Sequence, residues 1–175
     1  SDATLSFVNG TSDVVLDSTY KEYIFTFNNM HVSGSSAYGF TFQGSEDTGS
    51  SYGVTLTSTQ FYTYHGESAG DYGLTYNAGY DAAQSTSFIR LFTVSGVNND
   101  SAGSGQLHLF NPSSTTFVKH FISNCAEENT NYIEQVFVGG YFNTTSAVDA
   151  IQFKSSTGTI DAGDICLYGI TTWQV

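Results

Sequence analysis

The chain has 175 residues, of which 16 are acidic and only 4 are Lys or Arg, so its formal net charge is −12. An acidic surface repels nucleic-acid phosphates and anionic membranes, and no basic cluster follows a phosphate backbone, which excludes nucleic-acid binding. No run of about 18 apolar residues occurs, so we expect no membrane insertion. This length fits a single domain spanning residues 1–175.

Short runs of alternating apolar and polar residues recur along the chain, separated by Gly, Asn, Asp and Ser. In 20–30, Tyr23, Phe25 and Phe27 share one face of a predicted strand, and 38–42 repeats the pattern. The same criteria predict strands over 52–57, 60–65, 86–94, 106–110, 116–123, 132–142, 147–154 and 164–170. Only two short segments, 81–84 and 146–150, are weak candidates for helix.

Two of these strands, 86–94 and 164–170, carry apolar side chains on both faces. We therefore expect them to be central strands that are covered on both sides. About ten strands at spacings near ten residues, with no linker between them, are typical of one sandwich. The sequence predicts an all-β protein, an antiparallel β-sandwich most consistent with a jelly roll.

Cys125 and Cys166 are the only cysteines, and they lie too far apart in sequence to form a metal or redox motif. Free cysteine is commonly a small core residue, so two reduced, buried thiols are one interpretation. A single Cys125–Cys166 disulfide is the alternative, and the sequence leaves both open.

Motifs for catalysis are lacking, since the sequence has no nucleophile elbow, no phosphate-binding glycine loop and no histidines at metal-ligand spacing. Glycoside hydrolysis would need two carboxylates in one cleft. Sequence alone cannot pair the candidates, most of which lie in turn-like segments: Glu46, Asp47, Glu67, Asp71, Asp81, Asp100, Glu127, Glu128 and Glu134. We therefore predict a non-enzymatic protein without a cofactor.

Asp161 and Asp164 form a weak candidate for a calcium site, because a loop of oxygen ligands suits this ion. The alternative for 160–164 is a simple turn between two strands, which the sequence favours. We therefore predict no metal site.

Tyrosine is concentrated between residues 60 and 80, in contexts that resemble loops. Tyrosine suits places where one end of a side chain is apolar and the other is wet, as in interfaces and sugar-stacking platforms. The alternative is that these rings line the ends of the core. The candidate surface for a ligand or partner comprises Tyr62, Tyr64, Tyr72, Tyr76 and Tyr80.

Four segments carry a resemblance to a known family: DSTYKEYIF at 17–25, LFNPSSTTFVKHF at 109–121, GYFNTTSAVDAIQF at 140–153 and GTIDAGDICLYGI at 158–170. Together they resemble small structural proteins of tailed-bacteriophage virions, tail-fibre-like or decorating, which are common among phages of marine bacteria. The resemblance covers about residues 3 to 170 and supplies no catalytic residue.

The resemblance implies a β-rich component of the phage particle exterior, assembled in the host cytoplasm, with other virion proteins as partners. We expect a tail-fibre or tail-tip module that forms a homo-oligomer, most simply a trimer, and that contacts a host cell-surface glycan. A capsid decoration protein is the first alternative. A free carbohydrate-binding, lectin-like module is the second.

Overall fold

The computed structural model describes residues 1–34, 36–95, 98, 100–129 and 131–171. These residues form β1 (Leu5–Val8), β2 (Glu22–Val32), β3 (Ala37–Ser45), β4 (Leu56–Gly66), β5 (Tyr72–Tyr76), β6 (Ala82–Ser85), β7 (Ile89–Ser95), β8 (Gly103–Phe110), β9 (Lys119–Glu128), β10 (Tyr132–Phe142), β11 (Ala150–Ser155) and β12 (Ile160–Ile170). The described residues contain no helix, and therefore none that is long and apolar enough to cross a bilayer.

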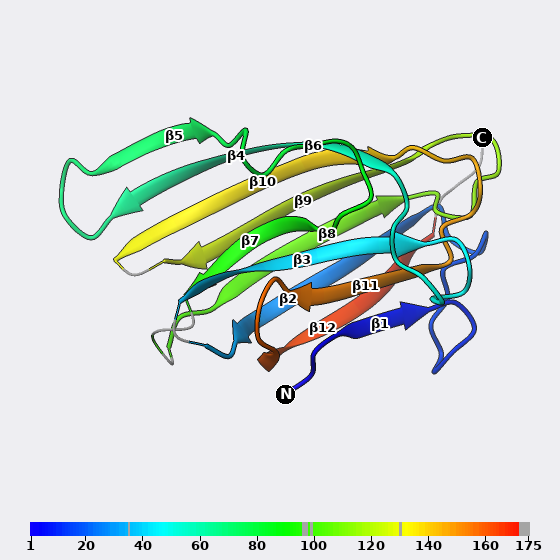
Figure 1. Cartoon of the computed structure of the whole chain (residues 1–175), viewed down its shortest axis with the longest axis horizontal. Coiled ribbons are helices and arrows are strands. Elements are labelled where there is room, and N and C mark those ends of the chain that lie inside the picture. The colour runs from blue at the N-terminus through cyan, green and yellow to red at the C-terminus, as the bar shows by residue number, and fades with distance from the viewer. Residues whose placement is uncertain (35, 96–97, 99, 130, 172–175) are drawn as a thin grey trace.

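The strands pair antiparallel in two sheets (Figure 1). The small sheet has the order β1-β11-β3-β7, and the large sheet has the order β12-β2-β8-β9-β10-β4-β5. β5 and β6 follow each other along the same edge of β4. The predicted all-β antiparallel sandwich is confirmed, while the jelly-roll connectivity stays a prediction.

Phenylalanine rings fill the space between the sheets, because the alternating residues of each strand place them on the inner face. The rings of Phe27 and Phe40 meet across the sheets at 5.2 Å between centroids, and those of Phe25 and Phe153 meet at 5.3 Å. Each fully buried side chain of this size contributes roughly 2–3 kcal/mol of transfer free energy. This aromatic core holds the two sheets face to face.

Several predicted boundaries and elements were wrong. The expected strand at 52–57 begins only at Leu56, and the two helix candidates form a strand, β6, and an irregular segment before β11. β7 and β12 are edge strands of their sheets, not central ones. In β12 the apolar residues on the second face are simply exposed, as Tyr168 is. β1 and β5 were not predicted as strands.

One end of the large sheet extends past the small sheet. In Figure 1 the ends of β4, β5 and β10 project beyond β3 and β7. The inner face of this projecting end therefore lacks an opposing sheet, and the side chains there border a groove.

Candidate ligand-binding groove

Two neighbouring hollows lie on the inner face of the projecting end. The inner hollow, beside β7, has a volume of about 340 Å³ and the outer hollow, nearer the tip, about 430 Å³. They share Tyr62, Asn129 and Glu134 in their walls. We call the two together the tip groove, and its principal side chains are Gln60, Tyr62, Tyr64, Asp71, Tyr80, Arg90, Glu127, Asn129, Tyr132 and Glu134.

Strand alternation decides which of the predicted tyrosines enter the groove. On β4, Gln60 reaches Arg90 of the small sheet with its side chain, so Tyr62 and Tyr64, two and four residues on, also face inward. Their rings lie 6.2 Å apart. Tyr64 lies 6.1 Å from the ring of Tyr132, which begins β10, so three rings line the groove.

Tyr72 and Tyr76 lie on the opposite, outer face of the large sheet. Tyr72 stacks on His65 with ring centroids 5.9 Å apart, and Tyr76 pairs with Phe61 across β4 and β5. The sequence predicted a loop at both tyrosines, and this prediction was wrong, because both belong to strand β5. The structure thus divides the predicted tyrosine surface into an inner and an outer group.

Tyr80 closes the groove on the side of the small sheet. The guanidinium carbon of Arg90 lies 3.9 Å from the centre of its ring, and Arg90 also donates to the Thr93 hydroxyl at 3.1 Å. The turn that carries Tyr80 is fixed to β4, since the Asn77 amide donates to the Gln60 carbonyl at 2.9 Å. Tyr80 and Arg90 therefore form a rigid wall.

Two glutamates of the groove appeared in the sequence only among nine candidate carboxylates that could not be paired. Glu127 of β9 and Glu134 of β10 are paired across the two strands, so their side chains share the inner face. Of the acids considered for glycoside hydrolysis, the inner hollow brings Glu127 and Glu134 together, and the outer hollow brings Asp71 and Glu134 together. Alternation could have indicated this, because Glu127 continues the parity of Phe121, but the predicted strand 116–123 ended before Glu127, whereas β9 extends to Glu128.

Glu127 is only 1% exposed, and neither of its carboxyl oxygens has a hydrogen-bond partner among the described residues. Burial raises the pKa of Glu127 well above its ordinary value, and the facing Glu134 carboxyl raises it further. The backbone of Thr93 and the positive charge of Arg90 lower the pKa of Glu127, but neither group forms a hydrogen bond with the Glu127 carboxyl oxygens. Burial and the neighbouring Glu134 carboxyl thus both disfavour the charged form of Glu127.

At the open end of the groove, Asp71 lies beside Tyr132 and raises the pKa of its phenol. The backbone of Asp71 fixes the turn before β5, because it accepts the Gly66 amide at 2.7 Å. This end of the groove thus combines aromatic faces with the half-buried carboxylate of Asp71, an arrangement that suits a polar ligand with an apolar face.

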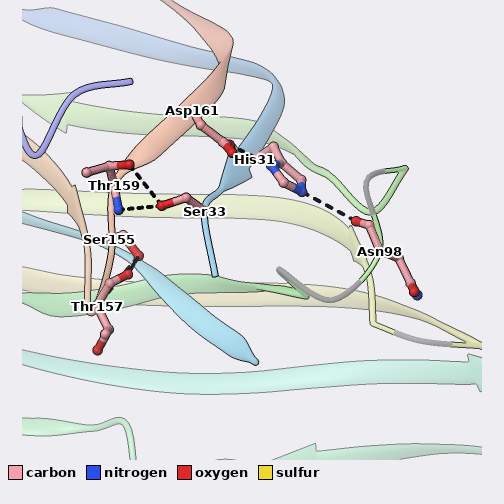
Figure 2. Close-up of polar contacts among 7 residues, drawn as sticks. All are labelled: His31, Ser33, Asn98, Ser155, Thr157, Thr159 and Asp161. Carbon is pink, nitrogen blue, oxygen red and sulfur yellow. Dashed lines mark hydrogen bonds and ion pairs between the residues drawn. The ribbon is translucent and has the colours of Figure 1, made fainter. Parts of the chain in front are cut away.

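Asp161 and Asp164, the weak candidate for a calcium site, do not lie together around an empty ion position, because Asp161 contacts a histidine. Figure 2 shows His31 between Asp161, whose carboxylate lies 2.6 Å from Nδ1, and the Asn98 carbonyl at 3.3 Å from Nε2. Asp164 is exposed beyond a bulge in β12. Within the described ranges no group of three or more His, Cys, Asp or Glu side chains is placed to hold a metal ion.

The rest of Figure 2 concerns the end of β2 and the turn before β12. Ser33 and Thr159 exchange hydroxyl and backbone hydrogen bonds, with their hydroxyl oxygens 2.9 Å apart. Ser155 donates to the Thr157 carbonyl at 2.5 Å. These contacts fix the turn that leads into β12 and form no nucleophile–base pair with His31.

Comparison of this chain with family models, with curated proteins and with solved structures found no match. The fold and the groove define a class of protein, namely an antiparallel β-sandwich with an open groove lined by tyrosines and carboxyls.

Proposed function

We propose that the chain is a non-enzymatic glycan-binding module on the exterior of a tailed-phage particle, in a tail fibre or tail tip. The observation that carries the binding role is the tip groove, whose outer hollow is lined by Tyr62, Tyr64 and Tyr132 at the end of the large sheet that projects past the small sheet. Aromatic faces beside acceptor oxygens bind the apolar and hydroxyl-bearing sides of a sugar ring. The particle setting rests on the resemblance of the four segments described above.

The geometry of the carboxyls supports binding over hydrolysis. Glycosidases of either stereochemistry hold their two carboxyls at least roughly 5 Å apart to admit the reacting sugar or water. Glu127 and Glu134 are instead directly paired on adjacent strands of one sheet, so their carboxyls belong to the same wall of the groove and do not flank a sugar bond from opposite sides.

The outer face of the large sheet supports the proposed homo-oligomer. The outward positions of β4, β5 and β10 carry no acid, although the chain has 16 acidic residues. Copies with a net charge of −12 repel one another, so the part of this face formed by β4, β5 and β10 is favoured for a second copy over the part that carries Glu22, Glu128 and Asp164. Exposed apolar side chains on this face of the sheet are Phe61, Tyr72, Leu74, Tyr76, Ile122, Ile133 and Tyr168.

Binding is tested with the purified chain on an array of bacterial surface polysaccharides, followed by calorimetry on the glycan that binds. Tyr64→Ala should lower the affinity about tenfold, since a stacked ring is worth roughly 1 kcal/mol or more. Phe117→Ala is the control, because it removes an exposed aromatic ring from a loop outside the groove. Equal affinities of the two variants, no binding at all, or release of reducing sugar would each contradict the proposal.

Assembly is tested by light scattering after size exclusion, where we expect a trimer. Ile122→Glu places a charge on the outer face and should yield monomers, whereas Thr115→Glu, in an exposed loop, should leave the trimer intact. A monomeric native chain would overturn this part of the proposal and favour the free lectin-like module. Binding to a major capsid protein would favour the capsid decoration alternative.

A further inference from the structure

We infer that the inner hollow of the tip groove is a subsite for an uncharged, hydroxyl-rich sugar, and that it rejects acidic sugars, sulfated sugars and amino sugars. This inference rests on the proposed glycan-binding function and adds the class of ligand. It is carried by the unpartnered oxygens of Glu127 and Gln60, which border the same hollow.

The hollow offers acceptors that the protein leaves unused. Both carboxyl oxygens of Glu127 and the amide oxygen of Gln60 lack a hydrogen-bond partner among the described residues, and Gln60 is 2% exposed. Buried polar atoms without a partner each cost roughly 1–3 kcal/mol, which a ligand donor recovers on binding. A ligand that fits must therefore bring hydrogen-bond donors to this end of the groove.

Anionic ligands do not meet this requirement. A carboxylate or sulfate group brings only acceptors, and it would face Glu127 and Glu134. Arg90 supplies a single opposite charge against these two carboxyls, and its guanidinium is held in place by the Tyr80 ring and the Thr93 hydroxyl.

Cationic ligands are opposed by Arg90. Its positive charge already acts on Glu127, so an ammonium group or a calcium ion in the hollow would meet a like charge. Sugar hydroxyls avoid both conflicts, because each donates one hydrogen bond and accepts another without carrying charge. The volume of about 340 Å³ lies within the range of hollows that take small ligands.

The test compares three kinds of oligosaccharide by calorimetry at pH 7: neutral hexose polymers, alginate and sulfated galactan fragments, and chitosan fragments. We expect binding of a neutral hexose oligosaccharide alone, with the same affinity in the presence of EDTA. Binding that is lost in EDTA, or a preference for an acidic, sulfated or amino sugar, would overturn the inference while leaving the proposed glycan binding in place.

The variant Glu127→Leu removes both acceptors and should lower the affinity for the neutral sugar by about ten- to a hundredfold. Ala126→Leu introduces leucine at the preceding position, whose side chain lies on the exposed outer face, and this variant should bind the sugar as the native chain does. Glu134→Gln is a second variant that keeps the shape of the half-buried side chain and should lower the affinity severalfold. If both glutamate variants bind normally while Tyr64→Ala does not, the sugar sits at the tip and the inference fails.

Discussion

The ring of Phe92 occupies the space that a side chain at Gly103 would need. A Cβ atom added at Gly103 would lie 2.2 Å from Cε2 of Phe92. The small sheet therefore meets β8 through this glycine, beside the wall of the tip groove. The absence of a side chain at position 103 is a packing requirement.

We expect Gly103→Ala to destabilise the protein by about 1–3 kcal/mol, because overpacking moves a buried ring in a core that is already filled. Gly139→Ala is the matched control, since a Cβ there would meet nothing within 4 Å. Urea unfolding of both variants measures the difference. Equal unfolding midpoints would show that Phe92 can move at no cost.

Replacement of Glu127 by Gln should change how stability depends on pH. The raised pKa means that the folded state retains a proton that the unfolded chain loses above its ordinary value of 4.5. Native stability therefore falls as the pH rises from about 4.5 toward the folded pKa, and Gln at this position escapes that loss.

Glu127→Gln should accordingly be more stable than the native chain by about 1–3 kcal/mol at pH 8, with the difference vanishing near pH 3.5. Unfolding in urea at a series of pH values measures it, and Glu67→Gln, at an exposed position, should show no such trend. A native chain that gains stability relative to the variant as the pH rises would contradict this account.

Removal of the Phe153 ring should be the most costly of the aromatic truncations. Phe153 is fully buried and contacts rings from both sheets, among them Phe25 and Phe40. Phe153→Ala should cost about 3–5 kcal/mol, whereas Phe117→Ala, at an exposed ring in a loop, should cost under about 1 kcal/mol. Thermal unfolding followed by near-ultraviolet circular dichroism separates the two, and comparable losses would refute the assignment of the core.

The two thiols should differ sharply in reactivity. Burial raises the pKa of the Cys125 thiol to about 12, whereas Cys166 is exposed on β12. Iodoacetamide should therefore alkylate Cys166 alone in the native chain and both cysteines in denaturant, as mass spectrometry would show. Native labelling of Cys125, or a mass that indicates a disulfide, would be inconsistent with this structure.

Much of the fold follows from residue alternation alone. The strand predicted at 132–142 coincides with β10, because Val136, Val138 and Phe142 keep a period of two between clear turn residues. β5 was missed because Leu74 and both tyrosines face outward, so no apolar core face identifies the segment as a strand. β12 has apolar residues on both faces, which led to the prediction of a central strand, but those on its outer face are exposed and the strand lies at the edge of its sheet.

The candidate groove could be predicted only in part. Tyr62 and Tyr64 were expected to contact a ligand, and alternation places them together on the inner face. Glu127 and Glu134 are paired by the register of β9 with β10, which depends on the length of the turn that joins them and on long-range packing. The sequence likewise left open whether Cys125 and Cys166 form a disulfide, and in the structure both are free thiols.

The projection of β4, β5 and β10 past the small sheet has an evolutionary consequence. Residues such as Tyr64 and Tyr132 lie outside the phenylalanine core. Their replacement therefore changes the ligand specificity of the groove without removing contacts from the core. Selection for a new ligand and selection for a stable scaffold thus act on different residues. We therefore expect related sequences to vary at this end of the sheet and to keep the aromatic interior.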